Sequence, residues 1–232
     1  MKTLGLIGGM SWESTVPYYQ RINQEIRQRL GGLHSAKLVL YSVDFQPIEQ
    51  YMRADEWDAA GARLAQAARA LELAGAEGLI LCTNTLHKVA PAIEAAVAIP
   101  LLHIVDVTAA AIRRTDIRTI GLLGTRFTME QPFYAERLLG RHGIRSLTPS
   151  AADRELANRI IFEELCLGRV LEPSCAHYRR IIGQLVAQGA QGIVLGCTEL
   201  AMLITPSDSA VPIFDTTALH AQAAVDWALS RV

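Results

Sequence analysis

Short apolar runs alternate with longer segments of mixed polarity along the chain. The runs at 4–7, 38–43, 79–81 and 100–104 lack strict alternation with polar residues, which is typical of strands buried on both faces. Segments 13–30 and 55–73 are predicted helices, the second because it is rich in strong helix formers, and another helix is expected after Asp106. This order of elements predicts an α/β fold with parallel sheets.

The same pattern restarts in the second half of the chain. Residues 119–128 (TIGLLGTRFT) echo residues 3–12 (TLGLIGGMSW), then 131–134 (QPFY) echo 16–19 (VPYY), and 211–218 (VPIFDTTA) echo 99–106 (IPLLHIVD). Three matches in one order indicate an internal duplication, and its long period excludes a solenoid.

The duplication predicts two pseudo-symmetric, doubly wound lobes with the active site between them. The expected division assigns 1–98 and 210–232 to the first α/β lobe and 99–209 to the second. The final strand and helix are therefore expected to return and pack on the first lobe.

One repeated stretch carries reactive side chains. Residues 189–200 (GAQGIVLGCTEL) align without gaps on 75–86 (GAEGLILCTNTL), so that Cys197 falls on Thr83 and Gly196 on Cys82. Ligands of open parallel sheets bind just past the carboxyl ends of strands, where Cys197 is expected. A shift of one residue along a strand turns a side chain to the opposite face. Cys82 is one residue out of register with Cys197, so Thr83 is the predicted counterpart of Cys197 in the first half. The alternative, in which Cys82 supplies a second thiol, remains open.

Composition and charge narrow the class of protein. Half of the residues are hydrophobic, the formal net charge is −1, and no basic cluster is present, so we expect neither a nucleic-acid nor a membrane partner. No apolar run is long enough to span a bilayer, and the first is too short for a secretion signal, which predicts a cytoplasmic protein.

The cysteine pattern gives no sign of a metal site or a disulfide framework. None of Cys82, Cys166, Cys175 and Cys197 belongs to a Cys-x-x-Cys pair or to a zinc-like spacing with histidine, so all four are predicted to be reduced thiols. Cys166 lies among apolar residues at helical spacing and is interpreted as a core residue.

Two proton-handling groups at equivalent strand ends suit removal and return of a proton at one carbon from opposite faces. Such chemistry inverts a stereocentre without a cofactor. A free thiol has a pKa of about 8.5, and a helix N-terminus can lower it, so Cys197 is the predicted base. Donors at Asn84, Thr85 and Thr198 are expected to stabilise the developing negative charge. None of the three lysines lies clearly at a strand end, so no pyridoxal Schiff base is indicated.

The glycine-rich turns after the first strand of each half suit a small anion. Neither turn has the spacing of a dinucleotide-binding or nucleotide-phosphate loop. A tight strand-to-helix turn lined with backbone N–H groups can still hold a carboxylate, which makes Met10–Ser11 and 125–128 candidate contacts.

These motifs together resemble the aspartate/glutamate racemase family. The similar segments are 196–199 (GCTE), 83–87 (TNTLH), 6–10 (LIGGM) and 122–128 (LLGTRFT), and the resemblance covers essentially the whole chain. It implies a cofactor-independent racemase for a small amino acid, with an acid/base pair in a two-domain fold that is often a homodimer. The family has Cys where this chain has Thr83. The chain looks closest to a bacterial subset with that change, which implies a preference for L-aspartate and L-glutamate.

The resemblance also implies a set of substrate contacts. In the family, basic residues hold the side-chain carboxylate. The first falls at Arg53, whereas the second falls near Glu163 and Glu164, where this chain is acidic. His87 and His220 are assigned capping or supporting roles. Around catalytic Thr83 and Cys197, the implied contacts are Met10, Met52, Arg53, Asn84, Thr85, Thr125, Thr128, Glu164, Thr198 and Glu199.

Other functions remain open from the residues. Hydantoin racemases, maleate isomerases and arylmalonate decarboxylases resemble this family and reuse one or two strand-end thiols. A decarboxylase needs only one proton donor, so a single thiol suits it. A non-catalytic amino-acid-binding module would use closure of a two-lobed cleft, but it would give a strand-end thiol no purpose.

Overall fold

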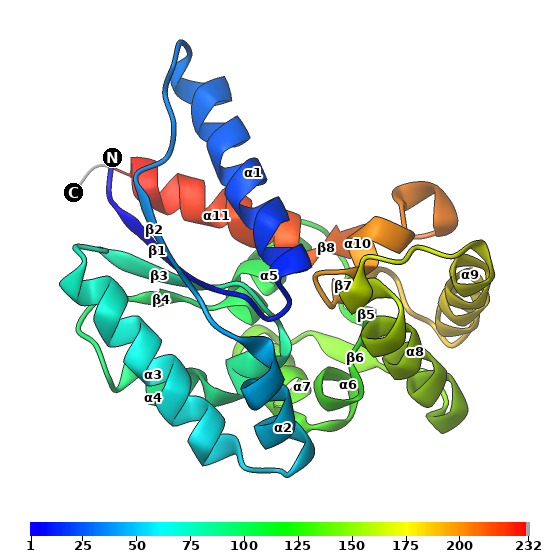
Figure 1. Cartoon of the computed structure of the whole chain (residues 1–232). Helices are drawn as coiled ribbons and strands as arrows, with labels where there is room; N and C mark the ends of the chain where they lie inside the picture. The colour runs from blue at the N-terminus through cyan, green and yellow to red at the C-terminus, as the bar shows by residue number, and fades with distance from the viewer. Residues whose placement is uncertain (231–232) are drawn as a thin grey trace. The chain divides into compact units, whose positions relative to one another are not determined.

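The computed structural model describes residues 1–230, which form two compact units. One unit comprises Met1–Ile104 and the segment from His220 onward, and the other comprises Val105–Leu219. Each contains a four-stranded parallel sheet with helices packed against it (Figure 1). The predicted α/β fold with two parallel sheets is therefore confirmed.

The first unit contains the sheet β2-β1-β3-β4. Its strands are β1 (Leu4–Gly8), β2 (Leu38–Ser42), β3 (Gly78–Leu81) and β4 (Leu101–Leu102). Its helices are α1 (Trp12–Leu30), α2 (Phe45–Arg53), α3 (Trp57–Leu73), η1 (Thr85–Val89), α4 (Ala90–Glu94) and most of α11 (Thr216–Leu229).

The second unit contains the sheet β6-β5-β7-β8, in the same relative strand order. Its strands are β5 (Thr119–Gly124), β6 (Arg145–Leu147), β7 (Ile193–Gly196) and β8 (Ile213–Asp215). Its helices are most of α5 (Ile104–Ile112), α6 (Arg126–Glu130), α7 (Pro132–His142), α8 (Ala151–Glu163), η2 (Leu165–Leu167), α9 (Glu172–Ala187), α10 (Leu200–Leu203) and η3 (Pro206–Asp208).

The duplication extends to strand register. Gly5 of β1 pairs with Leu79 of β3, and Gly121 of β5 pairs with Ile193 of β7 in the same way. The equivalent glycines also pack alike. A Cβ at Gly5 would lie 3.3 Å from Leu71 Cβ of α3, and one at Gly121 would lie 3.2 Å from Leu185 Cβ of α9. Each half therefore packs the helix that precedes its third strand closely against its first strand.

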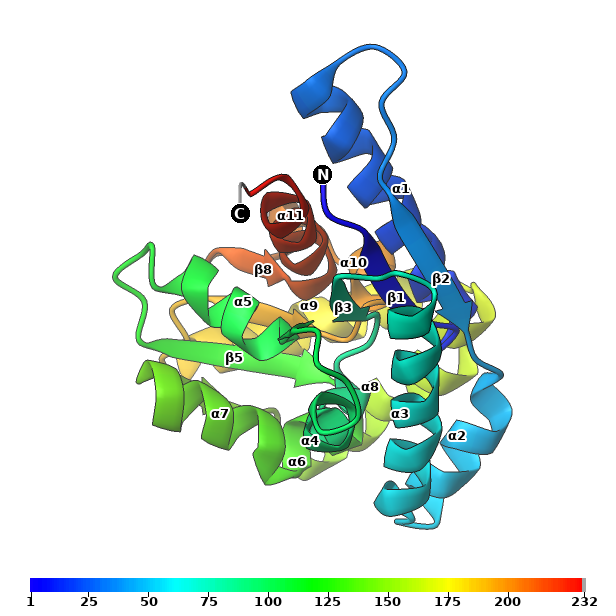
Figure 2. The same ribbon diagram turned by 90° about the vertical axis from the view of Figure 1, so that its left-hand side faces the viewer.

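Alternate strand residues of the first sheet face different helices. Leu4, Leu6 and Ile80 pack with residues of α1 and α11 in one hydrophobic cluster. Gly5 points the other way, toward α3. Figures 1 and 2 show α1 and α11 together on one side of this sheet and α3 on the other. Burial on both faces explains why the strands are continuously apolar.

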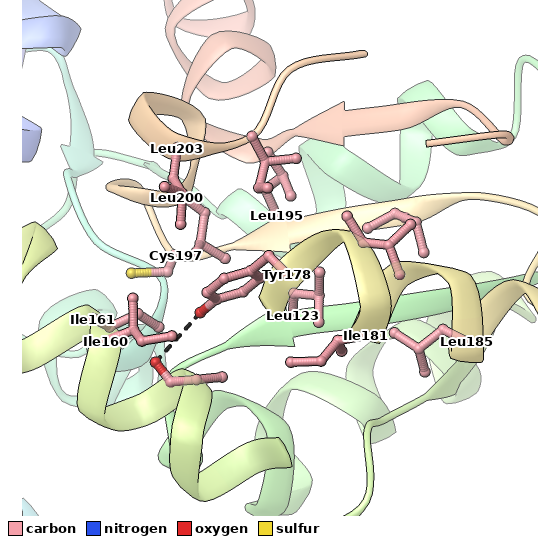
Figure 3. Packing of buried hydrophobic residues seen from close by; sticks show 14 of the residues in the cluster. Leu123, Ile160, Ile161, Tyr178, Ile181, Leu185, Leu195, Cys197, Leu200 and Leu203 are labelled. Carbon is pink, nitrogen blue, oxygen red and sulfur yellow. Dashed lines mark hydrogen bonds between the residues drawn. The ribbon is translucent and has the colours of Figure 1, made fainter. Parts of the chain in front are cut away.

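A hydrophobic core of the second unit lies between its sheet and two helices. Leu123 of β5 and Leu195 of β7 pack against Ile160 and Ile161 of α8 and against Tyr178 of α9 (Figure 3). All five side chains are buried. The strand end that carries Cys197 therefore rests on a well-packed apolar layer.

The structure corrects the expected course of the two last strands. The segment 99–104 was expected in the second lobe and 210–215 in the first, but β4 pairs with β3 and β8 pairs with β7. Each strand therefore completes the sheet of its own half. The chain passes from one unit to the other in the helix that follows each of these strands. After β4, α5 belongs mainly to the second unit, and after β8, α11 belongs mainly to the first.

A further difference concerns segment 45–73. The helix predicted over 55–73 is confirmed as α3 (Trp57–Leu73), but the sequence did not predict α2 before it. The two helices are separated around Asp55, whose φ of 59° is left-handed. Within residues 1–230, no helix is long and apolar enough to cross a membrane.

Candidate functional site

Cys197 follows directly on the end of β7. Ile193 and Leu195 of that strand face the hydrophobic cluster, and Cys197 belongs to the same cluster with 6% of its surface exposed. Figure 3 shows Cys197 in the same layer as Tyr178, Ile160 and Ile161, with its sulfur pointing away from the Tyr178 ring. The apolar surroundings restrict water at this thiol.

A buried carboxylate organises the polar side of Cys197. The thiol donates to Oε2 of Glu199 over 3.0 Å, and the Thr198 hydroxyl donates to the same oxygen over 2.7 Å. The Cys166 thiol, from η2, donates to Oε1 over 3.6 Å. Glu199 is only 3% exposed, so these three donors stabilise a charge that water scarcely reaches.

The electrostatics of Cys197 differ from the expectation. Burial raises the pKa of the Cys197 thiol well above its usual value, and the neighbouring Glu199 carboxylate raises it further. The predicted lowering by a helix N-terminus is wrong, because α10 has four residues and the charge of Glu199 stands directly before it. Cys197 therefore rests as a thiol, and its nearest proton acceptor is Glu199.

The equivalent strand end in the first unit presents Cys82 and Thr83. Cys82 is fully buried in the cluster with Tyr18 and Ile22 of α1, and this burial raises its pKa. Thr83 is 6% exposed and comes next along the chain. β3 ends at Leu81, and the chain turns at Cys82, because the Thr83 N–H donates to the Leu81 carbonyl oxygen at 2.8 Å. Cys82 is therefore placed as a core residue, and the catalytic role of Thr83 stays a prediction.

His87 fixes the backbone at Thr83. Its Nε2 accepts the Ile104 N–H at 3.2 Å, so this nitrogen carries no proton. The proton is then on Nδ1, which donates to the Thr83 carbonyl oxygen at 2.7 Å. Neutral His87 thus connects the end of β3 to the start of α5, in line with the supporting role predicted for it. Asn84 and Thr85, between Thr83 and His87, are both buried.

The two glycine-rich turns are held by threonine side chains. The Gly9 N–H donates to Thr15 Oγ1 at 2.8 Å, next to buried Met10. Gly9 has a φ of 91°, and a Cβ there would lie 2.2 Å from the Val43 carbonyl oxygen, so only glycine fits. In the second unit, Thr125 caps α6 by accepting the Thr128 N–H at 3.3 Å. These N–H groups therefore already have intramolecular acceptors.

The predicted side-chain contacts have other partners in the structure. Arg53 is exposed and forms an ion pair with Glu49, one turn earlier in α2, whereas the adjacent Met52 is buried. Glu164 Oε2 accepts a hydrogen bond from Ser174 Oγ at 2.5 Å. A role for either residue in binding substrate stays a prediction. Across residues 1–230, no group of three His, Cys, Asp or Glu side chains could hold a metal ion.

Cys166 is the polar contact that sequence reasoning missed. Helical spacing of its neighbours led to its interpretation as core, and it does pack partly against the hydrophobic cluster. Its thiol nevertheless reaches Glu199, which is 33 residues later in the chain. No local sequence motif predicts the contact between Cys166 and Glu199, because it depends on how η2 packs beside the end of β7.

The chain is similar to known proteins over most of its length. The model of the Asp/Glu/Hydantoin racemase family matches residues 7–224. The chain is 23% identical to the broad specificity amino-acid racemase RacX of Bacillus subtilis, over 98% of both chains.

Solved structures match over nearly the full length. A Yersinia pestis protein described as a "putative Asp/Glu Racemase" is 59% identical, with a TM-score of 0.92 over 99% of this chain and 100% of that one. An aspartate racemase homologue from Pyrococcus horikoshii OT3 is 34% identical, with a TM-score of 0.85 over 99% and 100% of the two chains. A glutamate racemase from Bacillus anthracis, 15% identical with a TM-score of 0.66 over 97% and 80%, shares the fold.

Proposed function

Because the chain belongs to the Asp/Glu/Hydantoin racemase family and is an amino-acid racemase, we propose that it interconverts the enantiomers of aspartate and glutamate without a cofactor. We further propose Cys197 and Thr83 as the acid/base pair. The observation that carries this proposal is the hydrogen bond from the Cys197 thiol to the buried Glu199 carboxylate, at a strand end. The names of the similar aspartate and glutamate racemases support this choice of substrates.

The Cys197–Glu199 pair supplies a base despite the raised pKa of the thiol. When the Cys197 proton moves to Glu199 Oε2, the thiolate forms and the net charge of the pair stays the same. The thiolate then takes the α-proton, so that an S–H bond forms, the Cα–H bond breaks and its electron pair stays on the carbon. Transfer within the pair avoids the cost of a second buried negative charge at this strand end.

Return of a proton to the opposite face of the carbon completes inversion. In our proposal the Thr83 hydroxyl gives this proton, directly or through a bound water, and recovers one from solvent. A hydroxyl ionises far less readily than a thiol, so Thr83 is a poor base for starting from the other enantiomer. Together with the likeness to the Thr-containing subset, this favours faster turnover of the L-enantiomer.

The test is exchange of the α-proton in D₂O, followed by proton NMR with L- and D-aspartate and L- and D-glutamate. Cys197→Ala should abolish exchange from the L-enantiomers. Glu199→Gln should lower kcat by roughly 10²- to 10⁴-fold, because a general base contributes about that much. Cys175→Ala is the control, since its thiol donates to the Leu203 carbonyl oxygen and not to a carboxylate. Exchange by Cys197→Ala near the wild-type rate would contradict the assignment.

A decarboxylase is the second candidate, favoured by the protonated resting state of Cys197. Loss of carbon dioxide from a 2-substituted malonate leaves a carbanion that needs one proton donor. Carbon dioxide release from such malonates, without α-proton exchange of any amino acid, would support this function in place of racemisation.

A further inference from the structure

The outer edge of β2 is apolar and has no partner strand within residues 1–230. Strand β2 lies at one end of the sheet β2-β1-β3-β4 and pairs there only with β1 (Figure 2). Its sequence, LVLYS, has no charged residue and no proline, which natural edge strands commonly use to prevent pairing with another chain. Leu40 is 41% exposed and Tyr41 is 38% exposed, although the apolar pattern predicted a strand buried on both faces. This edge is therefore suited to a partner strand.

The hydrogen bonds to β1 show which backbone groups of β2 face outward. The Lys37 carbonyl oxygen accepts the Leu4 N–H at 2.9 Å, and the Val43 N–H donates to the Gly8 carbonyl oxygen at 3.0 Å. In a parallel pair, alternate residues of a strand direct both of their backbone groups to the same neighbour. The odd-numbered residues from 37 to 43 therefore bond to β1. The N–H and C=O groups that point away from the sheet belong to Leu38, Leu40 and Ser42.

We propose that β2 pairs antiparallel with β2 of a second copy of this chain, across a twofold axis at Leu40. Both copies present the same edge, and such a self-complementary contact closes after two copies. A register centred on Leu40 uses every outward-facing residue of the strand, because Leu38 bonds to Ser42 of the second copy and Leu40 bonds to its own counterpart. This inference is independent of the proposed function.

Charge complementarity favours the antiparallel arrangement of two copies. Lys37 stands directly before β2 and Asp44 stands two residues after its end, and both are exposed. In the register centred on Leu40, Lys37 lies opposite Val43 of the second copy and thus beside Asp44 of that copy. The twofold axis repeats this contact at the other end of the strand pair. A parallel arrangement would bring like charges together at both ends, which is destabilising.

The same register covers apolar side chains on both faces of the paired strands. Leu40 meets its own counterpart on one face, and Tyr41 lies opposite Val39 of the second copy on the other, a stabilising pair of aromatic and β-branched side chains. A stable interface buries about 800 Å² on each partner, which is more than one short strand provides. Leu33, fully exposed in the connection before β2, extends the contact, because this connection runs toward the start of α2 of the second copy.

The first measurement is the oligomeric state, by sedimentation equilibrium over a series of concentrations. The wild type should be a dimer with twice the chain mass of 25.3 kDa. Leu40→Lys places two like charges opposite each other at the twofold axis and should raise the dissociation constant by about 100-fold or more. Leu139→Lys is the matched control, because Leu139 is an exposed leucine of α7 in the second unit, and it should leave the constant unchanged.

Two further variants separate the backbone and charge contributions. Ser42→Pro removes an outward-facing N–H, which an edge strand tolerates, and should raise the dissociation constant roughly tenfold. It replaces Leu40→Lys if circular dichroism shows that Leu40→Lys is unfolded. Lys37→Glu removes a charge pair at each end of the strand pair and should raise the constant by roughly 5- to 10-fold.

Hydrogen–deuterium exchange tests the strand pairing itself, by mass spectrometry with single-residue fragmentation. The amides at positions 38, 40 and 42 should exchange slowly in the dimeric wild type and rapidly in Leu40→Lys. The amides at positions 39 and 41 bond to β1 and should stay protected in both. A wild type that is monomeric at every concentration would overturn the inference. So would a dimer that Leu40→Lys leaves intact, a dimer that Leu139→Lys weakens equally, or rapid exchange at position 40 in the wild-type dimer.

Discussion

The buried imidazole of His220 should make the first unit sensitive to mild acid. His220 is fully buried in α11, and its Nε2 donates to the Leu102 carbonyl oxygen at 2.8 Å. Because Nε2 carries the proton, Nδ1 accepts the Tyr18 hydroxyl at 2.9 Å. The neutral ring thus connects α1, β4 and α11, and a second proton would place a positive charge in a fully buried site.

The magnitude follows from the pKa of this group. Burial lowers the pKa of His220 from 6.5 to about 4. Between these values the unfolded chain binds a proton that the folded protein does not, so stability falls as the pH falls. At about 1.4 kcal/mol for each pH unit, the full effect is about 3 kcal/mol, of which roughly 2–3 kcal/mol is lost between pH 7 and pH 4.5.

The assay is urea unfolding at pH 7 and pH 4.5, followed by tryptophan fluorescence. The three tryptophans of the chain, Trp12, Trp57 and Trp227, all belong to the unit that contains His220. The signal therefore reports unfolding of that unit. His220→Gln should be less stable at pH 7 and should lose about 2–3 kcal/mol less than the wild type on acidification.

The matched control is His34→Gln. His34 is exposed, so this variant removes a histidine of the same unit without removing a buried contact. The reasoning is refuted if the wild type and His220→Gln lose equal free energy of unfolding between pH 7 and pH 4.5.

Two further predictions test the strand end of the first unit. Cys82→Ala should lower the free energy of unfolding by roughly 1–2 kcal/mol, measured by urea unfolding, because it opens a small cavity in a fully buried site. It should retain α-proton exchange, and loss of exchange in a folded variant would identify Cys82 as the second acid/base group. Thr83→Cys should raise the ratio of kcat for D- over L-glutamate, because it adds a second competent base. An unchanged ratio in steady-state kinetics would count against Thr83.

The sequence by itself determined the repeated architecture and its strand ends. Apolar runs and turn glycines act over a few residues, and parallel pairing brings the carboxyl ends of strands to one edge, so the positions of Thr83 and Cys197 could be predicted locally.

Only the tertiary structure decided which groups surround these strand ends. Cys166 contacts Glu199 across 33 residues, and His220 contacts Leu102 across 118 residues. The spacing of apolar residues along a short segment does not predict such contacts, because they depend on how complete helices and turns pack. The same packing buries Cys197 beside Glu199, and for this reason its pKa rises where a sequence-based argument from a helix N-terminus predicted that it would fall.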